Sequence, residues 1–420
     1  MSTTVIAVPK NVEGSKQSTD ATNLKKKKVK QSSFCSKLAC TGKKKSVLNN
    51  DEIIRAADHY LQALFNQQQF SGSVLIAKDG EILLIKGYGC ADYTSSLGNN
   101  SQTVFRIGSV TKPFTATIVM KLYELNLLSL NDPLSKYVPD FANGEQIKIK
   151  HLVSNTSGII DYTETSIFME SLEKNLPIDR VIDIFRNEPL QFTPGSKYAY
   201  SNSNFILLGN IIEKVTGKSY EGNLYKFILE PCCMNDSGYD CDHDTSTPKQ
   251  QIVDSNITEQ KQTELILETK PHEPLVKKTK RACGYICHTD PDGLGTCRFI
   301  DMSLARAAGG IYSTVEDLYK FDRCLYNETI LRRATKKVMF KPVKEDYALG
   351  WRIEHPGSRL PWLRHLCIAH EGEIFGFMSA MARFPKDNAF IAVLSNFEHT
   401  DIAKIRRDLT DILYGLYPKE

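Results

Sequence analysis

The chain has 420 residues, of which 41% are hydrophobic and 24% are charged, a composition typical of globular proteins. Its net charge of +4 is unevenly distributed, because residues 1–50 contain eleven lysines, no arginine and two acids, and the remainder of the chain is therefore acidic overall. The body of the chain thus gives no reason to expect a nucleic-acid enzyme, and the lack of any run of about eighteen apolar residues excludes a transmembrane helix.

Residues 1–50 are rich in lysine, serine and threonine and poor in aromatic residues. Such a segment buries too little apolar surface to offset its ordering entropy, so we expect a disordered, solvated tail. A nuclear-import signal, a tether to an anionic surface and a nucleic-acid contact are the less favoured alternatives. The start of the chain has neither the apolar run of a secretory signal nor the arginines of a mitochondrial presequence. We therefore expect a cytoplasmic protein, with the nucleus as the alternative.

Secondary-structure patterns begin after this tail. Residues 51–68 carry apolar side chains at helical spacing, which predicts an amphipathic helix. Two β-rich runs follow, Ser73–Ala77 and Ile82–Lys86. The Asp79-Gly80 dipeptide between them predicts a tight hairpin.

The middle of the chain reads as mostly helical, and its end returns to strands. Helices are predicted over Lys112–Leu125 and Phe205–Val215. Strands are predicted over Phe375–Phe384 and Ala389–Ser395, and a helix over Asp401–Leu416 closes the chain.

Strands near both ends of the body predict one antiparallel sheet assembled from distant parts of the chain. We expect an α/β (α+β) fold in which residues 51–100 and 300–420 form a sheet flanked by helices. A helical subdomain is expected over about 101–240, and the polar segment 242–280 is expected to be a surface excursion. The chain thus divides into the tail and one domain, residues 51–420.

The eleven cysteines are scattered along the chain. Cys283, Cys287 and Cys297, with His288, form the one group that hints at a metal, but their spacing matches no zinc template. We therefore expect free thiols and no metal site.

Ser109 and Lys112 are the first candidates for chemistry. A serine followed three residues later by a lysine at the start of a helix places both side chains on one face. The helix N-terminus adds a positive potential and free N–H groups. The spacing alone is weak evidence, because Ser171–Lys174 and Ser246–Lys249 share it. Ser109 differs in lying between a strand-like segment and an apolar helix.

Tyr200 and Asn202 form the second candidate, the one Tyr-x-Asn sequence in the chain. A tyrosine held beside an ammonium group is expected to have a lowered proton affinity and to serve as a general base, while an amide such as Asn202 can hold a substrate carbonyl. The structural alternative is a helix cap, in which Ser201 or Asn202 starts the following helix.

His370-Glu371-Gly372 is the third candidate, directly before a predicted strand. A histidine on an edge strand facing a cleft can hydrogen-bond a substrate or the tyrosine. A lone histidine is more often structural. A second His-x-Gly sequence begins at His355, but its proline suits a turn better than a strand.

Taken together and in this order, the three motifs resemble those of the serine β-lactamase-related family, the group of class C β-lactamases, D-peptidases and esterases. The family's motifs are Ser-x-x-Lys, Tyr-x-Asn and Lys-or-His-x-Gly. The resemblance covers about residues 51–416. It extends to the blocks Phe105–Ala116, Ile147–Gly158, Pro194–Gly217, Ala308–Thr314 and Leu349–Trp351.

The resemblance implies a β-lactamase/transpeptidase-like fold and a role for each motif residue. Ser109 would be the acylated nucleophile and Lys112 its proton acceptor or electrostatic activator. Tyr200 would deprotonate Ser109 or, later, the hydrolytic water, and which of the two acts first stays open. Asn202 would position the substrate amide, with His370 and Gly372 lining the substrate site. The backbone N–H groups of Ser109 and Glu373 would form the oxyanion hole. The mechanism needs no metal or organic cofactor.

His370 departs from class C β-lactamases, which carry a lysine at this position. Histidine is largely neutral above about pH 7, whereas lysine is a permanent cation. We therefore expect weaker electrostatic capture of a β-lactam carboxylate.

The leading hypothesis is thus an acyl-serine hydrolase whose small-molecule or peptide substrate is a β-lactam, a D-amino-acid peptide or an ester. The alternative is a catalytically idle, penicillin-binding-like scaffold that binds a partner or self-assembles. The presence of all four residues of the first two motifs argues against it. A third, weaker alternative gives the main role to nucleic-acid association by the tail. The sequence does not indicate an oligomeric state.

Overall fold

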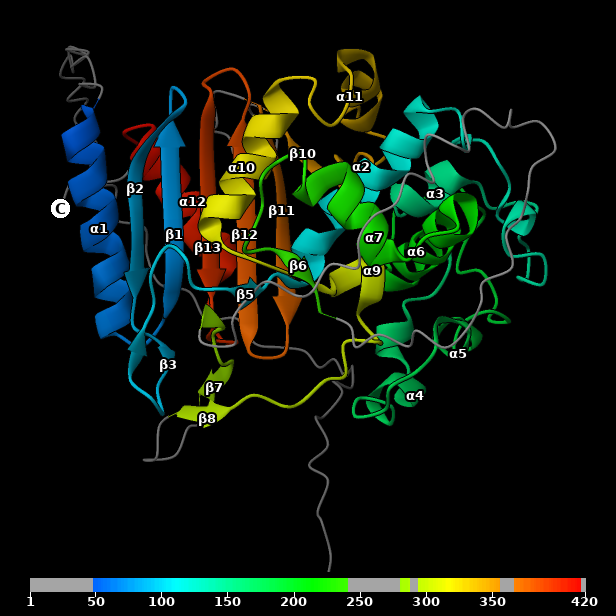
Figure 1. The fold of residues 1–420 in the computed structure, drawn as a ribbon, viewed down its shortest axis with the longest axis horizontal. Helices are drawn as coiled ribbons and strands as arrows, with labels where there is room; N and C mark the ends of the chain where they lie inside the picture. The colour runs from blue at the N-terminus through cyan, green and yellow to red at the C-terminus, as the bar shows by residue number, and fades with distance from the viewer. Residues whose placement is uncertain (1–47, 241–279, 288–293, 356–365, 417–420) are drawn as a thin grey trace, which may run out of the picture. The chain divides into compact units, whose positions relative to one another are not determined.

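The computed structural model describes residues 48–240, 280–287, 294–355 and 366–416. The predicted disordered tail and the predicted surface excursion over 242–280 therefore lie, apart from residues 48–50 and 280, outside the described residues. The main sheet is antiparallel, with strand order β10-β11-β12-β13-β1-β2 (Figure 1). Its strands are β1 (Gly72–Lys78), β2 (Glu81–Tyr88), β10 (Arg352–Glu354), β11 (Cys367–Ile374), β12 (Phe377–Phe384) and β13 (Ala389–Ser395).

The sheet joins strands from the two ends of the described body, as the sequence predicted. β1 pairs with β13 from Gly72 opposite Ser395 to Ala77 opposite Phe390. The predicted hairpin is confirmed: Asp79 and Gly80 both have positive φ, the conformation that a tight two-residue connection needs. β12 begins at Phe377, two residues later than predicted, because Gly376, at φ +80°, makes the turn from β11.

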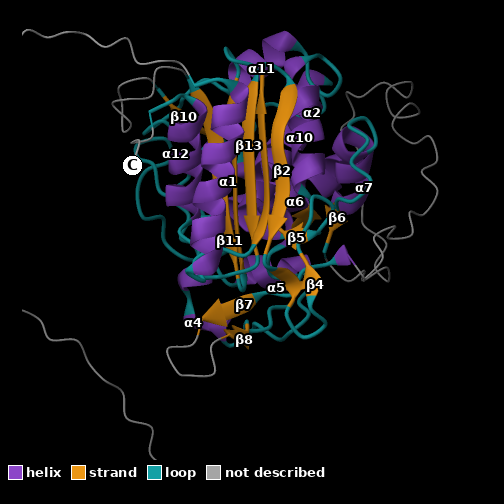
Figure 2. Ribbon diagram, turned by 90° about the vertical axis from the view of Figure 1, so that its left-hand side faces the viewer, coloured by secondary structure: helices purple, strands orange, loops and turns teal. Residues whose placement is uncertain are grey.

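Helices cover both faces of the sheet (Figures 1 and 2). The first helix and the last pack on one face, α1 (Asn50–Asn66) and α12 (Ile402–Leu413). The other face carries α2 (Thr111–Glu124), α10 (Val315–Tyr326) and the remaining helical part of the chain. The remaining helices are α3 (Ile149–Val153), α4 (Ser166–Met169), α5 (Ile178–Asp183), α6 (Asn202–Thr216), α7 (Tyr220–Leu224), α9 (Arg306–Gly309) and α11 (Arg333–Met339), with a π-helical turn η4 (Tyr225–Leu229).

Short strands and 3₁₀ turns complete the described structure. β9 (Ile311–Ser313) lies between β5 (Phe105–Arg106) and β6 (Gly238–Tyr239) in a small sheet. The other short strands pair as hairpins, β3 (Cys90–Asp92) with β4 (Leu97–Gly98) and β7 (Tyr285–Cys287) with β8 (Leu294–Thr296). The 3₁₀ turns are η1 (Gly108–Val110), η2 (Leu134–Lys136) and η3 (Tyr162–Glu164).

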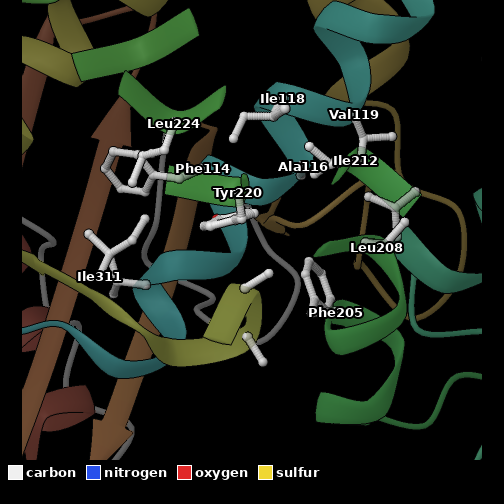
Figure 3. Packing of buried hydrophobic residues seen from close by; sticks show 14 of the residues in the cluster. Phe114, Ala116, Ile118, Val119, Phe205, Leu208, Ile212, Tyr220, Leu224 and Ile311 are labelled. Carbon is white, nitrogen blue, oxygen red and sulfur yellow. The ribbon is translucent and has the colours of Figure 1, made fainter. Parts of the chain in front are cut away.

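α2 is the central helix of the larger core, and it is buried over most of its length. Phe114 stacks on Phe321 of α10, with ring centroids 4.1 Å apart. Figure 3 shows other α2 side chains packed against residues of α6 and α7, including Phe205 and Leu224. The Thr115 hydroxyl also donates to Ala307 O and accepts a 2.6 Å hydrogen bond from the Tyr220 hydroxyl. Because every face of α2 is held, the turn that precedes it has little freedom to move.

Candidate active site

Ser109 lies in η1, the 3₁₀ turn between β5 and α2. Gly108 makes this turn possible, with a φ of +46° that disfavours any residue with a side chain. A Cβ at Gly108 would also lie 2.6 Å from Glu373 O and 2.9 Å from Glu373 N. The turn is thus pressed directly against β11, which brings the backbone of Ser109 beside that of Glu373.

Lys112 and Tyr200 both reach the Ser109 hydroxyl. Lys112 Nζ is 2.9 Å from Ser109 Oγ, and the Tyr200 hydroxyl donates to the same oxygen at 2.7 Å. Lys112 Nζ also contacts two acceptors, Asn202 Oδ1 at 2.7 Å and Ala308 O at 2.9 Å. The structure therefore brings together four residues that the sequence placed in two separate motifs.

Lys112 is fully buried at the start of α2. Burial lowers the pKa of its ammonium group to about 7, and the nearby Asp161 carboxylate opposes that shift. The aromatic rings of Tyr200 and Phe205 lie 4.8 Å and 5.4 Å from Nζ and stabilise the charged form. An amine with this pKa exchanges a proton readily near neutral pH.

Tyr200 lies in the loop before α6; the residue is 37% exposed, and its hydroxyl is directed at Ser109. The sequence analysis expected a lowered proton affinity, but desolvation raises the pKa of the Tyr200 phenol well above its ordinary value. The hydrogen bond with Ser109 only partly opposes that rise. Tyr200 is therefore protonated in this arrangement, and Lys112 is the more readily available proton acceptor.

Asn202 is held at both ends of its side-chain amide. Its Oδ1 faces Lys112, and its Nδ2 donates to Asp161 Oδ2 at 2.9 Å. The helix-cap alternative holds in position only: α6 starts at Asn202 with Ser201 as its N-cap residue, but no side-chain cap hydrogen bond forms, and Ser201 Oγ donates to Ile160 O instead.

Asp161 is the site residue that the sequence analysis missed. Its other oxygen, Oδ1, accepts hydrogen bonds from the N–H and hydroxyl of Thr163 at 3.1 Å and 2.9 Å. The carboxylate is thus fixed on one side by a turn and on the other by Asn202. The available signal was its position three residues after Gly158, just beyond the block that resembles the family.

His370 is on β11, which is not the edge strand that the sequence predicted. The edge strand is β10, which pairs with β11 over only three residues. The pair nearest the site is Arg352 of β10 with Ala369 of β11. The stretch of β11 from His370 onward therefore has no strand on that side and packs against η1.

The ring of His370 is buried and neutral. Burial, together with the positive charges of Lys112 and Arg352, lowers its pKa to about 3. Its Nδ1 lies 2.6 Å from Glu371 O, so Nδ1 carries the proton, and Nε2 accepts the hydroxyl of Tyr347 at 3.2 Å. Its hydrogen-bond partner is thus Tyr347 rather than Tyr200.

Gly372 and Glu373 complete the strand beside the serine. A Cβ at Gly372 would overlap Ile107 O and lie 2.8 Å from Val110 N, so glycine permits the close approach of β11 to η1. Ser379 on β12 stabilises the same approach, because its hydroxyl donates a 2.7 Å hydrogen bond to Ile107 O. The side chain of Glu373 is exposed, and its backbone lies beside Gly108.

A cleft of about 640 Å³ opens over these residues. It is lined by Ser109, Tyr200 and Asn202 from the helical part and by residues 369–375 of β11 and its turn. Apolar side chains, including Phe168 and Ile300, line another part of it. Its size is within the usual range for small-molecule sites.

The remaining predictions concern metals and membranes. Cys283 and Cys297 are free thiols, while the side chain of Cys287 and residue His288 lie outside what the structure describes. Over the described residues, no group of three or more His, Cys, Asp or Glu side chains is arranged to hold a metal ion. Nor does any described helix have the length and apolar character needed to cross a membrane.

Comparison with known proteins shows the family to which the chain belongs. The family model described as Beta-lactamase matches residues 52–414. Penicillin-binding protein 4* of Bacillus subtilis (strain 168) is 27% identical over 358 residues, covering 81% of this chain and 72% of that protein. The teichoic acid D-alanine hydrolase of Staphylococcus aureus (strain MRSA252) is 32% identical over 198 residues, 47% of each chain.

Among solved structures, the octameric penicillin-binding protein homologue from Pyrococcus abyssi superposes with a TM-score of 0.68 at 26% identity. The match covers 87% of this chain and 78% of that one.

Proposed function

The chain belongs to the beta-lactamase family of serine hydrolases, and we propose that it hydrolyses an ester or amide through an acyl-enzyme on Ser109. One observation carries this proposal: the Ser109 hydroxyl lies between Lys112 Nζ at 2.9 Å and the Tyr200 hydroxyl at 2.7 Å. A nucleophile in contact with both a proton acceptor and a proton donor has what acyl transfer requires.

The hydrogen bonds around Lys112 support it as the acceptor in the first proton transfer. A neutral amine has two N–H bonds, and Asn202 Oδ1 and Ala308 O are placed to accept them. Its lone pair then points at Ser109, whose own oxygen accepts from Tyr200. With a pKa of about 7, much of Lys112 is in this neutral form at neutral pH. Lys112 is therefore the base and Tyr200 the acid of the acylation step.

The proton balance closes over one turnover. In acylation the serine proton passes to Lys112, Ser109 Oγ bonds to the carbonyl carbon, and the Tyr200 proton goes to the leaving group. In deacylation the Tyr200 phenolate, beside the Lys112 ammonium, takes a proton from the attacking water, and Lys112 returns its proton to the departing Ser109. The backbone N–H groups of Ser109 and Glu373 are proposed to hold the carbonyl oxygen in both steps.

Asn202 has a positioning role in this proposal. Its amide is engaged by Lys112 and Asp161, so it orients the base rather than the substrate amide that the sequence analysis assigned to it. Fixing the base in advance lowers the reorganisation needed during the reaction.

The proposed substrate is an ester or amide of a D-amino acid, with a β-lactam as the alternative. The name of the Staphylococcus aureus relative supports the first choice. The neutral His370 does not supply the permanent cation that class C enzymes carry at this position, so a β-lactam carboxylate would need another cationic partner in the cleft.

The test is intact mass after incubation with a fluorophosphonate, followed by turnover of D- and L-alanine p-nitroanilides, a 4-nitrophenyl ester and a chromogenic cephalosporin. We expect a mass increase and turnover in wild type, and neither in Ser109→Ala. Ser171→Ala is the matched control, since Ser171 begins another Ser-x-x-Lys sequence away from the cleft. A folded protein that gives no adduct with any probe contradicts the hydrolase proposal and favours the idle scaffold.

A further inference from the structure

Two arginines line the cleft, and they differ in their partners. Arg406 of α12 is buried and ion-paired with Glu354, through Nη2 at 2.7 Å, and with Glu371, through Nε at 3.0 Å. Its charge is therefore neutralised within the fold, and it has no free edge to offer a ligand.

Arg352 has no such partner. It is half-buried on β10, it lines the cleft that contains Ser109, and its guanidinium forms no hydrogen bond or ion pair with the described residues, although its backbone pairs with β11. Its positive charge acts on other groups of the cleft: it adds to the lowering of the His370 pKa, and it partly opposes the rise in pKa that burial causes at Tyr200 and Tyr347. A guanidinium that faces a cleft without a carboxylate beside it is available to an anion.

The backbone under Arg352 is rigid. Arg352 pairs with Ala369 of β11, next to His370, and the preceding Trp351 is buried and stacked on Phe321 with centroids 6.3 Å apart. The guanidinium is thus carried by a fixed strand end one position from the third motif. We propose that Arg352 is the carboxylate-binding group of this cleft, so that the substrate is an ester or amide that carries a free carboxylate.

This inference rests on the proposed acyl-serine chemistry and adds the substrate class. A neutral His370 leaves the third motif without a cation, and Arg352 provides one from the neighbouring strand. A carboxylate suits it because the planar guanidinium binds two carboxylate oxygens at once. Glu354 and Glu371, which line the same cleft on β10 and β11, are both paired with Arg406 rather than with Arg352.

The test uses two pairs of esters that differ only in charge. In 3-acetoxybenzoate and 3-acetoxybenzamide the charge is on the leaving group, and in mono-4-nitrophenyl glutarate and its methyl ester it is on the acyl group. In Arg352→Gln, kcat/KM for the carboxylated member of at least one pair should fall roughly tenfold to a hundredfold. The neutral member should change less than about twofold, and Arg352→Lys should be intermediate because a point charge replaces the fork.

Controls separate this inference from the proposed function. Arg180→Gln removes an exposed arginine that does not line the cleft and should leave both pairs unchanged. Equal changes in the charged and neutral members of both pairs would overturn the assignment of Arg352, while Ser109-dependent hydrolysis of the neutral esters would keep the proposed function.

A binding measurement decides the question even if no ester is hydrolysed. Ser109→Ala and Ser109→Ala/Arg352→Gln are titrated with both carboxylated esters, and thermal melting confirms that each variant is folded. Weaker binding in the double variant, with a difference that shrinks as salt is added, supports the inference. Equal dissociation constants for both carboxylated esters reject it.

Discussion

The two walls of the cleft use their polar groups in different ways. On the helical wall, Lys112, Asn202 and Asp161 form a continuous chain of hydrogen bonds with one another. On the sheet wall, Arg352 has no ion pair with the described residues, and the Glu373 side chain is exposed.

This difference separates chemistry from recognition. Groups whose hydrogen bonds are satisfied within the protein are fixed before a substrate arrives, which suits proton transfer. A charged group without a partner gains most from a ligand that supplies one. We therefore expect changes to the polar side chains of the helical wall to act on kcat, and changes to the polar side chains of the sheet wall to act on KM and on substrate choice.

Removing the base should have the largest effect. Lys112→Met keeps a long apolar side chain in a buried position but removes the proton acceptor beside Ser109. We expect kcat/KM to fall by about a thousandfold, within the usual range for the loss of a general base. Steady-state kinetics on a 4-nitrophenyl ester measures this loss.

The control for this change is Lys121→Met, later on the same helix, where the lysine pairs with Glu124 away from the cleft. It should retain nearly full activity. A Lys112→Met enzyme that keeps more than about a tenth of wild-type activity would show that Lys112 is not the base.

Forcing the two walls apart should be the next most damaging change. The Cβ added in Gly372→Ala would meet the backbone of Ile107 and Val110, which must move to accommodate it. We expect the free energy of unfolding to fall by about 1–3 kcal/mol. Because Ser109 and Glu373 would separate, kcat should fall about a hundredfold.

Denaturant unfolding and steady-state kinetics measure both effects of Gly372→Ala. Gly98→Ala is the matched control on a strand, since the nearest atom to its added Cβ is 4.0 Å away. Unchanged kcat in a folded Gly372→Ala enzyme would mean that this close approach does not set the geometry of the site.

The sequence was sufficient for the elements with strong local signals. The Asp79-Gly80 turn, the helix after Ser109 and the single antiparallel sheet assembled from the two ends of the body all follow from residue patterns. β11 was harder to predict, because His370, Glu371 and Glu373 interrupt the apolar alternation that usually marks a strand. Its position became clear only through pairing with β12 and contact with η1.

The site was predictable in its motif residues and not in its electrostatics. Asp161 and Arg352 belong to no short motif, and their roles depend on contacts between segments distant in sequence. The direction of the Tyr200 pKa shift was predicted wrongly. The sequence shows a lysine nearby but does not show how far burial disfavours the phenolate.

Asp161→Asn tests the charge on the helical wall. The substitution keeps an oxygen for Asn202 Nδ2 but removes the carboxylate that raises the pKa of Lys112. The Lys112 pKa should therefore fall below about 7, and the acid limb of the pH profile of kcat/KM should move to lower pH. The maximum of kcat/KM should drop roughly tenfold as the network loosens.

A pH–rate profile distinguishes this role from a purely structural one. Asp132→Asn, which removes a carboxylate bonded to Tyr137 outside the cleft, should leave the acid limb in place. An acid limb that moves to higher pH in Asp161→Asn, or does not move, would contradict the assigned electrostatic role.

Adding a cation to the sheet wall should have the smallest effect. His370 is neutral because burial and the charges of Lys112 and Arg352 hold its pKa near 3, so His370→Lys adds a charge where none exists. KM for a carboxylated cephalosporin should fall a few-fold, about the worth of one additional ion pair. The gain should be larger in an Arg352→Gln background, where the new ammonium replaces the lost guanidinium.

The control is His355→Lys, which makes the same exchange at the other His-x-Gly sequence and should leave KM unchanged. If His370→Lys also leaves KM unchanged in both backgrounds, the charge at the third motif does not select the substrate, and the sheet wall does not have the recognition role inferred from its unpaired groups.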